Sequence, residues 1–340
     1  MTSVVRRVAL SLAGGGCLWA AFPSVGAWPL APVGVGLIAL ATRGTSARFG
    51  AVLGLLAGWA FFLPTLTWSG SYLGDLPWIA LSTLQAGYWA LLGAASAFLQ
   101  GQVSLAGIGR IRPFVIALLW VAQEWLRGTT PYGGFPWVRL AYSQADSPLG
   151  RLAAWGGPPA VTFAVALVGA VLASAASAAW RERTWRSVAA PVLVAVSVSV
   201  MGYAVPVATD GPTADVVAVQ GNVPRAGLDF NAERRAVLDN HARGTTTEAA
   251  RRSAAAELPP DLVVWPENSS DIDPARNADA LAVIDNAVNA IRAPIIVGTF
   301  ASTATDIYNV SLLFQPGRAT PVAGYAKRHP VPFAEYIPNR

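Results

Sequence analysis

The chain has 340 residues, of which 54% are hydrophobic and 13% charged, and its formal net charge at pH 7 is +5. Soluble globular proteins carry about 25% charged residues, so this composition excludes an ordinary soluble protein. The apolar content also excludes a disordered chain, while one Cys and two His exclude a disulfide scaffold and a Cys/His zinc site. The sequence implies neither a metal nor an organic cofactor.

The charge is distributed unevenly along the chain. Residues 1–207 hold 12 Arg and 4 acidic residues, whereas residues 208–340 hold 11 Arg, one Lys and 15 acidic residues. The positive excess thus lies in the charge-poor first part, between apolar runs, which indicates membrane topology rather than binding to nucleic acid. We predict a transmembrane helical domain over 1–207 and a second domain of ordinary charge density over 208–340.

Long apolar stretches fill the first domain. A membrane span needs about 20 mostly apolar residues, and seven segments reach or approach this length. The first also has the charge pattern of a signal peptide, but the spans that follow it favour a membrane helix. We predict a membrane α-helical bundle of about seven spans, over residues 8–24, 28–42, 50–68, 76–99, 113–127, 158–180 and 188–207.

Arg residues recur on every second connection between these spans. They precede the first span and lie between spans 2 and 3, 4 and 5, and 6 and 7, as Arg6, Arg7, Arg43, Arg48, Arg110, Arg112, Arg181, Arg183 and Arg186. Because basic loops stay in the cytoplasm, this pattern predicts a cytoplasmic N-terminus. Seven crossings then place the second domain on the extracytoplasmic side.

The segment 120–151 departs from the pattern of a plain span. It is rich in aromatic residues, Gly and Pro, and it carries several charged side chains. Glu124 lies in an apolar helical run three residues before Arg127, so the two side chains can face each other. One interpretation is a structural pair that ties the end of the fifth span to this segment. The other is functional, since ionisable residues inside a membrane often mark a site, here the wall of a lipid-facing one.

Strands and helices alternate in the second domain. Short apolar runs predict strands over 215–220, 261–265, 294–299 and 308–315, with a fifth beginning near 321. A polar segment at 231–255 and an amphipathic one at 276–291 predict two helices between the first three strands. This order, followed by a hairpin, predicts a mixed α/β sandwich.

Three charged residues lie where such folds place their chemistry, near the ends of strands. Glu267 directly follows the strand at 261–265, and Glu335 lies in the segment HPVPFAEYIP. Lys327 is the only lysine among 24 basic residues, which favours a site that needs a compact ammonium rather than a planar guanidinium. Structural alternatives stay open, because Lys327 can be a surface residue of an Arg-favouring sequence and Glu267 a cap or salt-bridge partner.

Several motifs of this sequence resemble bacterial apolipoprotein N-acyltransferases. VVAVQGNVP, LVVWPEN, the YN at 308–309 and YAKRHPVPFAEYIP are similar to their nitrilase-type domain. AFPSVGAWPL, the helix with Glu124 and Arg127, GGFPW and AYSQ are similar to their transmembrane part. The resemblance runs in order over essentially the whole chain. It implies a membrane helical bundle followed by a partial α/β nitrilase-type αββα sandwich.

The resemblance also implies a Glu–Lys–Cys triad. Glu267 matches the general base, Lys327 the lysine that stabilises the oxyanion, and Glu335 a supporting carboxylate. A thiol attacks an ester as a thiolate, so a carboxylate must take its proton, and an ammonium can stabilise the resulting oxyanion. In the membrane part we expect the aromatic segment 131–142 to line an entrance for acyl chains, with candidate lipid-binding residues Glu124, Arg127, Trp137, Tyr142 and Gln144.

The sequence departs from the family at the nucleophile. The resemblance places the nucleophilic Cys beyond the VPF-x-E segment, where this sequence has none. Its one Cys, Cys17, lies in the first predicted span, and we expect it to be structural because a thiolate is disfavoured in apolar surroundings. We therefore expect a C-terminally truncated form with an incomplete second domain, inactive by itself.

The implied function is N-acylation of lipoproteins at the cytoplasmic membrane. An acyl chain would move from a phospholipid to the Cys as a thioester, and then to the α-amino group of the diacylglyceryl-cysteine of an apolipoprotein. The alternative is a membrane-anchored, non-catalytic scaffold with a degenerate nitrilase half. The missing Cys favours this alternative, and the intact Glu267, Lys327 and Glu335 disfavour it. A transporter is disfavoured because no inverted repeat is visible and charges inside the spans are rare.

Overall fold

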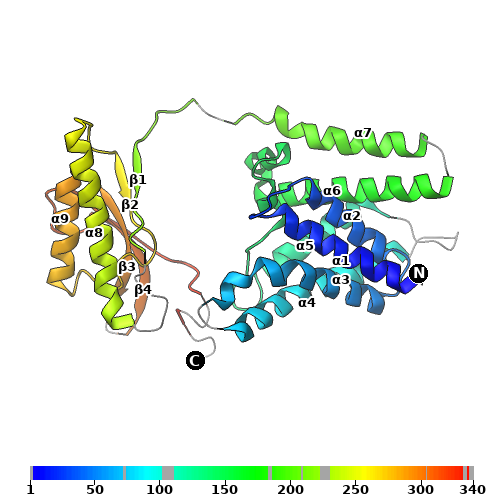
Figure 1. Cartoon of the computed structure of the whole chain (residues 1–340), viewed down its shortest axis with the longest axis horizontal. Coiled ribbons are helices and arrows are strands. Elements are labelled where there is room, and N and C mark those ends of the chain that lie inside the picture. The colour runs from blue at the N-terminus through cyan, green and yellow to red at the C-terminus, as the bar shows by residue number, and fades with distance from the viewer. Residues whose placement is uncertain are drawn as a thin grey trace. The chain divides into compact units, whose positions relative to one another are not determined.

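The computed structural model describes residues 3–71, 74–101, 111–182, 186–207, 210–222, 230–303, 305–331 and 335–336. The chain consists of two compact units, Met1–Thr209 and Asp210–Arg340, both drawn in Figure 1. Two of the arginines used to predict topology, Arg110 and Arg183, lie outside the described residues, as do parts of the motifs VVAVQGNVP and HPVPFAEYIP.

The described residues of the first unit form a helix over each of the seven predicted spans. The helices are α1 (Ser3–Ala21), α2 (Leu30–Thr42), α3 (Ala47–Thr65), α4 (Asp75–Gly101), α5 (Pro113–Arg127), α6 (Ala153–Glu182) and α7 (Arg186–Met201). Among the described residues, three apolar helical ranges are long enough to cross a membrane, namely Ser3–Ala21, Ala47–Thr65 and Pro148–Ala179. The apolar helical character of this unit is therefore confirmed, and the number of membrane crossings stays a prediction.

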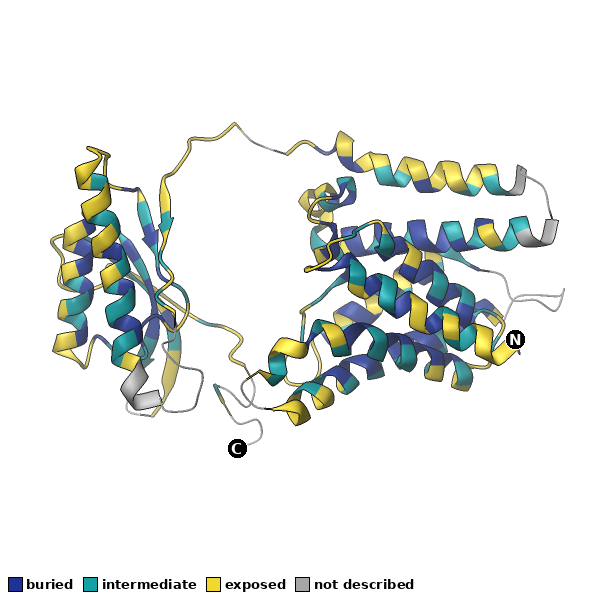
Figure 2. Ribbon diagram, in the orientation of Figure 1, coloured by how far each residue is buried: buried dark blue, intermediate teal, exposed yellow. Residues whose placement is uncertain are grey.

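Burial differs between the helices of this unit. Figure 2 shows buried residues concentrated where α1 to α6 face one another, whereas α7 carries mostly exposed or half-buried residues. The exposed residues of α7 include large apolar side chains such as Leu193 and Val196. A helix that is apolar on its exposed sides suits lipid rather than water, which agrees with a membrane-bound unit.

Small residues let α3 and α4 pack closely. Gly50, Gly54 and Gly58 recur at four-residue spacing on α3, on the face turned toward α4. A Cβ atom added at Gly54 would lie 1.9 Å from the carbonyl oxygen of Trp89, a separation that no real side chain tolerates. Close approach through small residues is a common basis of helix association in membranes, where burial from water supplies no driving force between helices.

Replacing Gly54 with valine should therefore destabilise the helical unit by about 3 kcal/mol or more, because the two helix backbones must separate. Gly87 on α4 offers a matched control, since nothing lies within 4 Å of a Cβ added there. Thermal unfolding in detergent should show a large loss for Gly54→Val and a much smaller one for Gly87→Val. Equal stability of the two variants would contradict the proposed close packing.

The second unit is a five-stranded sheet with two helices. The strands are β1 (Val216–Ala218), β2 (Leu262–Val264), β3 (Ile295–Ser302), β4 (Ile307–Phe314) and β5 (Ala323–Ala326), in the order β1-β2-β3-β4-β5. β1, β2 and β3 pair in parallel, whereas β4 pairs antiparallel with both β3 and β5. The mixed sheet and its concluding hairpin were predicted from the sequence, and the structure confirms both.

Helices α8 (Phe230–Ala254) and α9 (Ala278–Ile291) lie on the same face of this sheet (Figure 1). Their apolar residues, among them Leu238 and Ile284, pack against alternate strand residues that include Val263, Ile295 and Val297. This alternation follows the period of two in a strand, so one face of each strand forms the core. The structure thus shows one helix layer on one sheet, and the full sandwich stays a prediction.

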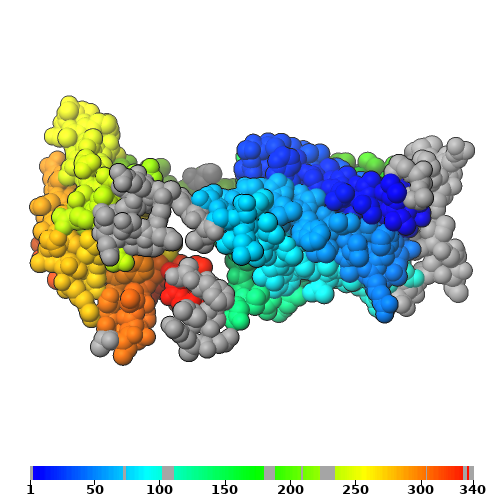
Figure 3. Space-filling view, turned by 60° about the horizontal axis from the view of Figure 1, so that its bottom comes forward, coloured from blue at the N-terminus to red at the C-terminus, as the bar shows by residue number. Residues whose placement is uncertain are grey.

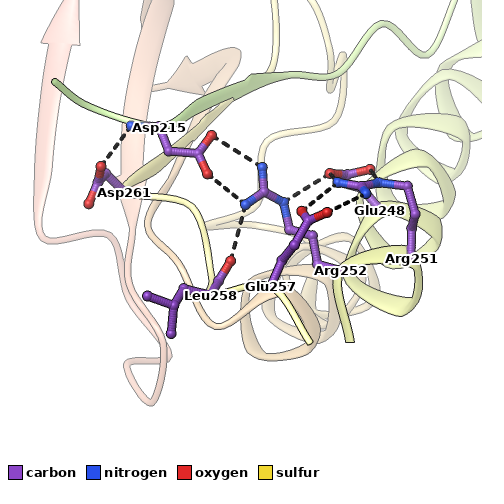
Figure 4. Close-up of polar contacts among 7 residues, drawn as sticks. All are labelled: Asp215, Glu248, Arg251, Arg252, Glu257, Leu258 and Asp261. Carbon is purple, nitrogen blue, oxygen red and sulfur yellow. Dashed lines mark hydrogen bonds and ion pairs between the residues drawn. The ribbon is translucent and has the colours of Figure 1, made fainter. Parts of the chain in front are cut away.

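Charged side chains fasten the end of α8 to the starts of β1 and β2 (Figure 4). Arg252 donates to both carboxylate oxygens of Asp215, at 2.6 and 3.2 Å, and to the carbonyl oxygen of Leu258 at 3.1 Å. The backbone N–H of Asp215 in turn donates to Asp261 at 2.7 Å. Hydrogen bonds, first from Arg251 and then from Arg252, lower the pKa of Glu248 to about 2. Because most of these groups are exposed, the cluster orients α8 more than it stabilises the fold.

His241 of α8 is buried against the sheet and faces Trp265. Its Nδ1–H donates to the carbonyl oxygen of Val237 at 2.8 Å, and its ring centre lies 5.6 Å from that of Trp265. Among the described residues, Nε2 has no hydrogen-bond partner. Burial lowers the pKa of His241 below its ordinary value of 6.5, and the bond to Val237 opposes this only in part. The folded unit therefore favours the neutral ring.

This arrangement gives the second unit a pH-dependent stability. The unfolded chain binds a proton at His241 below about pH 6.5, while the folded chain resists it, so stability is complete above that pH and falls as the pH decreases through it. Hydrogen exchange of peptides covering β2, measured in urea between pH 7.5 and 5.5, should show this loss. A His241→Phe variant should lose the dependence, and His329→Asn should keep it. Unchanged dependence in His241→Phe would contradict the assignment.

Candidate functional site

The second unit brings together the three charged residues singled out in its sequence. Lys327 follows β5 directly, and its Nζ donates to Glu267 Oε1 at 2.8 Å. The same ammonium donates to Glu335 Oε1 and Oε2 at 3.2 and 3.0 Å. Residues 60 positions apart in the sequence, Glu267 and Lys327, are therefore direct neighbours in the fold.

The strand order explains how Glu267 reaches Lys327. Glu267 follows β2, whereas Lys327 follows β5, and β3 and β4 lie between these strands. The chain after β2 must therefore cross the sheet edge over β3. A Cβ atom at Gly298 of β3 would lie 2.3 Å from the carbonyl oxygen of Pro266, so glycine is needed for this crossing. The Ser269 hydroxyl fixes the crossing segment by donating to the carbonyl oxygen of Gly298 at 2.9 Å.

Asn309 of β4 completes the cluster, and the candidate residues chosen from the sequence did not include it. Its Nδ2 donates to Glu267 Oε1 at 2.5 Å and to Glu335 Oε1 at 2.7 Å. Its carbonyl oxygen accepts the backbone N–H of Lys327 at 2.8 Å. Asn309 thus binds both carboxylates through its side chain and Lys327 through its backbone. The YN pair at 308–309 was noted as a motif, but the cross-strand position that gives Asn309 this role depends on the register of β4 with β5.

The contacts within the cluster favour the charged forms of Lys327 and Glu335. Burial alone would lower the pKa of Lys327, but the hydrogen bonds to Glu267 and Glu335 outweigh burial and raise it. Burial likewise favours a higher pKa for Glu335, yet hydrogen bonds from Asn309, Val331 and Lys327 bring it below the ordinary value. Glu267 is the most open of the three, with 54% of its side chain exposed against 29% for Lys327 and 18% for Glu335. An exposed carboxylate beside a fixed ammonium can exchange a proton with a ligand.

A cavity of about 820 Å³ adjoins this cluster within the second unit. Asn309, Lys327 and Glu335 form part of its wall, and other wall residues include Tyr308, Tyr336 and Arg234. Among the described residues, no group of three or more His, Cys, Asp or Glu side chains could hold a metal ion. The ammonium and the two carboxylates of the cluster are suited to acid–base and electrostatic chemistry.

The candidate residues of the first unit fall into two groups. Glu124, Arg127 and Gln144 are buried, whereas Trp137 and Tyr142 are 58% and 49% exposed. Cys17 lies on α1 of this unit and is half-buried. The structure therefore separates residues that can hold the aromatic segment from residues that can touch a lipid.

The buried acid of this group binds the chain beyond α5. Glu124 accepts the backbone N–H of Leu140 at 2.6 Å and the hydroxyl of Thr162 at 2.8 Å. The first bond fixes the end of the aromatic segment, and the second fixes α6. One carboxylate thus joins α5, α6 and the segment between them.

The buried base binds the same segment at other points. Arg127 donates to the carbonyl oxygens of Phe135 and Trp137, at 3.0 and 2.7 Å. The described residues contain no ion pair of 4.0 Å or less between Glu124 and Arg127, so the two groups are joined mainly through the segment that both hold. Each residue thus binds the segment that follows the fifth predicted span, and both interpretations of the pair, structural and lipid-facing, stay predictions.

Comparisons with known proteins agree with the order of these parts. Residues 14–171 match the family described as the apolipoprotein N-acyltransferase N-terminal domain. Apolipoprotein N-acyltransferase of Mycolicibacterium smegmatis is 39% identical over 97% of this chain and 58% of its own length. Those of Photobacterium profundum and Methylococcus capsulatus are 28% and 29% identical over 98% and 99% of this chain, and 64% and 66% of their own lengths. The chain thus spans about three fifths of the curated relatives it matches.

Proposed function

Because this chain belongs to the apolipoprotein N-acyltransferase family, we propose that the whole protein transfers an acyl chain from a phospholipid to the N-terminal amine of lipoproteins. The observation that carries the proposal is the convergence of Glu267, Lys327 and Glu335, with contacts of 2.8–3.2 Å about one ammonium. A site of these groups can move a proton and stabilise an oxyanion, as ester and amide chemistry require.

The proposed reaction has two balanced steps. In the first, a Cys thiol gives its proton to Glu267 and the sulfur attacks the ester carbonyl of the phospholipid, with Lys327 stabilising the oxyanion. The carbon–oxygen bond breaks, and the leaving alkoxide takes the proton from Glu267. In the second step, the lipoprotein amine attacks the thioester, the carbon–sulfur bond breaks, and the amine proton passes through Glu267 to the leaving thiolate, which restores the thiol and the Glu267 carboxylate. Glu335 and Asn309 hold Lys327 and Glu267 in place throughout.

The second unit has no Cys in its sequence that could act as the nucleophile of this reaction. The sequence has one Cys, Cys17, and it lies on α1 in the other unit. We propose that the 340 residues by themselves do not form the thioester. A non-catalytic scaffold remains the competing function, and the experiment below separates the two.

We further propose that both steps of the reaction take place at the outer face of the cytoplasmic membrane. The seven helices and the alternating arginines support an N-terminus in the cytoplasm and a second unit outside, completed as an αββα sandwich. Trp137 and Tyr142 are exposed on the segment held by Glu124 and Arg127, so they are the residues that we expect to meet acyl chains entering from the bilayer.

The proposal is tested with membranes that carry the whole protein, including any residues its gene encodes outside this sequence. These are incubated with a diacylated lipoprotein and phospholipid, and the product is analysed by mass spectrometry. An added acyl group on the N-terminal amine supports the acyltransferase. No product, in parallel with product from an authentic enzyme, would favour the scaffold.

Asn309 provides a sharper test of the cluster. Replacing it with alanine removes two hydrogen bonds to charged carboxylates, and we expect acyl transfer by the whole protein to fall about 10- to 100-fold. Asn289→Ala is the matched control, because Asn289 accepts the backbone N–H of Gly317 at 3.0 Å away from the cluster. Parent activity in Asn309→Ala would show that the two carboxylates need no such bridge.

A further inference from the structure

A small cavity lies inside the helical unit, between α1, α3, α4, α5 and residues 138–140. Its volume is about 10 Å³, and its wall includes the rings of Phe22, Phe61, Trp89 and Trp120. Neighbouring rings in this wall have centroids 5.0–5.3 Å apart. Gln123, Glu124 and Arg127 supply polar groups to the same cavity. The aromatic wall is thus joined by three polar side chains of α5.

Two of the wall residues carry buried polar atoms that need a partner. Gln123 is 6% exposed, and among the described residues neither its Oε1 nor its Nε2 has a hydrogen-bond partner. The same holds for the indole N–H of Trp89, which is 3% exposed. An amide or indole left unsatisfied in an apolar interior costs free energy, and a membrane bundle offers no bulk water to satisfy it.

The size of the cavity selects its occupant. A buried water needs roughly 10–15 Å³ and two to four polar partners, and this cavity provides both. It is too small for an acyl chain or a lipid head group. We propose that this cavity is a hydration site that binds one ordered water molecule, which accepts a hydrogen bond from Trp89 Nε1 and donates one to Gln123 Oε1.

This hydration site belongs to the support of the aromatic segment. Glu124 and Arg127 line the cavity and also hold the backbone of Leu140, Phe135 and Trp137. The proposed water therefore lies in a cavity that Glu124 and Arg127 also line, beside the groups that hold this segment. The inference concerns the helical unit and does not depend on the proposed acyl transfer.

Hydroxyl radicals generated by X-rays from bound water provide the test, using the whole protein in lipid nanodiscs and mass spectrometry of its peptides. We expect Trp89 and Trp120 to be oxidised although both are buried, because radicals form beside them. Phe62 is equally buried but does not line the cavity, and it should stay unmodified. Trp155 is 62% exposed and reports labelling by bulk water.

A matched pair of variants connects the labelling to Gln123. Gln123→Leu removes the amide that is proposed to bind the water. It should abolish oxidation of Trp89 and Trp120 and leave that of Trp155 unchanged. Gln100→Leu replaces another buried glutamine that does not line the cavity, and it should leave their oxidation at the parent level. Parent protein labelled at Trp155 but not at Trp89 or Trp120 would overturn the proposal, even if Gln123→Leu does not fold. Undiminished labelling in folded Gln123→Leu would overturn it as well.

Discussion

Replacing Lys327 with arginine is expected to reduce acyl transfer by the whole protein about 10²- to 10³-fold, the loss seen when one well-placed oxyanion donor is removed. The Lys327 ammonium meets two carboxylates at 2.8–3.2 Å, in a space shaped for a single nitrogen. A guanidinium keeps the charge but spreads it over a planar fork. It would pair with Glu267 and Glu335 in another geometry and present no donor at the position of the oxyanion.

The neighbouring residue supplies the control for this exchange. Arg328 is exposed and makes none of the contacts of the cluster, so Arg328→Lys should keep the parent kcat. Single-turnover formation of the acyl-enzyme, followed by mass spectrometry, separates the chemical step from lipid binding. Near-parent turnover by Lys327→Arg would remove Lys327 from the proposed catalytic set. It would not bear on the family of the chain.

The order of strands and helices in the second unit was predictable because each element depends on local pattern. The amphipathic repeat over 276–291 became α9 (Ala278–Ile291), and the apolar run at 294–299 became β3 (Ile295–Ser302). Glu267 and Lys327 stood out through a strand end and an unusual residue choice. Each of these signals is contained in a few neighbouring residues of the sequence, so no knowledge of the tertiary fold was needed to find it.

Other parts of the site depend on contacts that a local pattern does not contain. Asn309 is one polar residue in an apolar strand, and only the pairing of β4 with β5 places it beside Lys327. In the sequence, Gly298 has no feature that distinguishes it from other strand glycines. Only the close approach of the chain at Pro266 shows why glycine is needed there. The partners of Glu124 were likewise hidden, because Leu140 and Thr162 lie 16 and 38 residues away in the sequence.

Arg127 illustrates how such contacts combine in the helical unit. It is 1% exposed, and it donates to the carbonyl oxygens of Phe135 and Trp137 and to the side-chain oxygen of Gln85. Its guanidinium also lies 5.5 Å from the ring centre of Phe62, a favourable cation–π distance. These contacts join α3, α4 and α5 to the aromatic segment, so the effect of removing the charge extends beyond one ion pair.

Replacing Arg127 with methionine is therefore expected to destabilise the helical unit by about 3–5 kcal/mol, because it leaves a buried carboxylate and buried carbonyl oxygens without the cation that they face. Methionine keeps the volume of the side chain but leaves Glu124 without its nearby cation and the carbonyl oxygens of Phe135 and Trp137 without a donor. Thermal unfolding in detergent measures the loss, and Arg151→Met, at an exposed position, should change little.

The double variant Glu124→Gln/Arg127→Met tests whether the two charges act together. If they are coupled through the segment 135–140, the double variant should lose less stability than the sum of the two single variants, because the uncompensated carboxylate is gone. Trp137→Ala separates support from contact, since it removes the exposed ring but leaves the backbone carbonyl that Arg127 binds. We expect Trp137→Ala to impair acyl transfer while stability holds, and Arg127→Met to impair both. Additive losses in the double variant would show that Glu124 and Arg127 hold the segment independently.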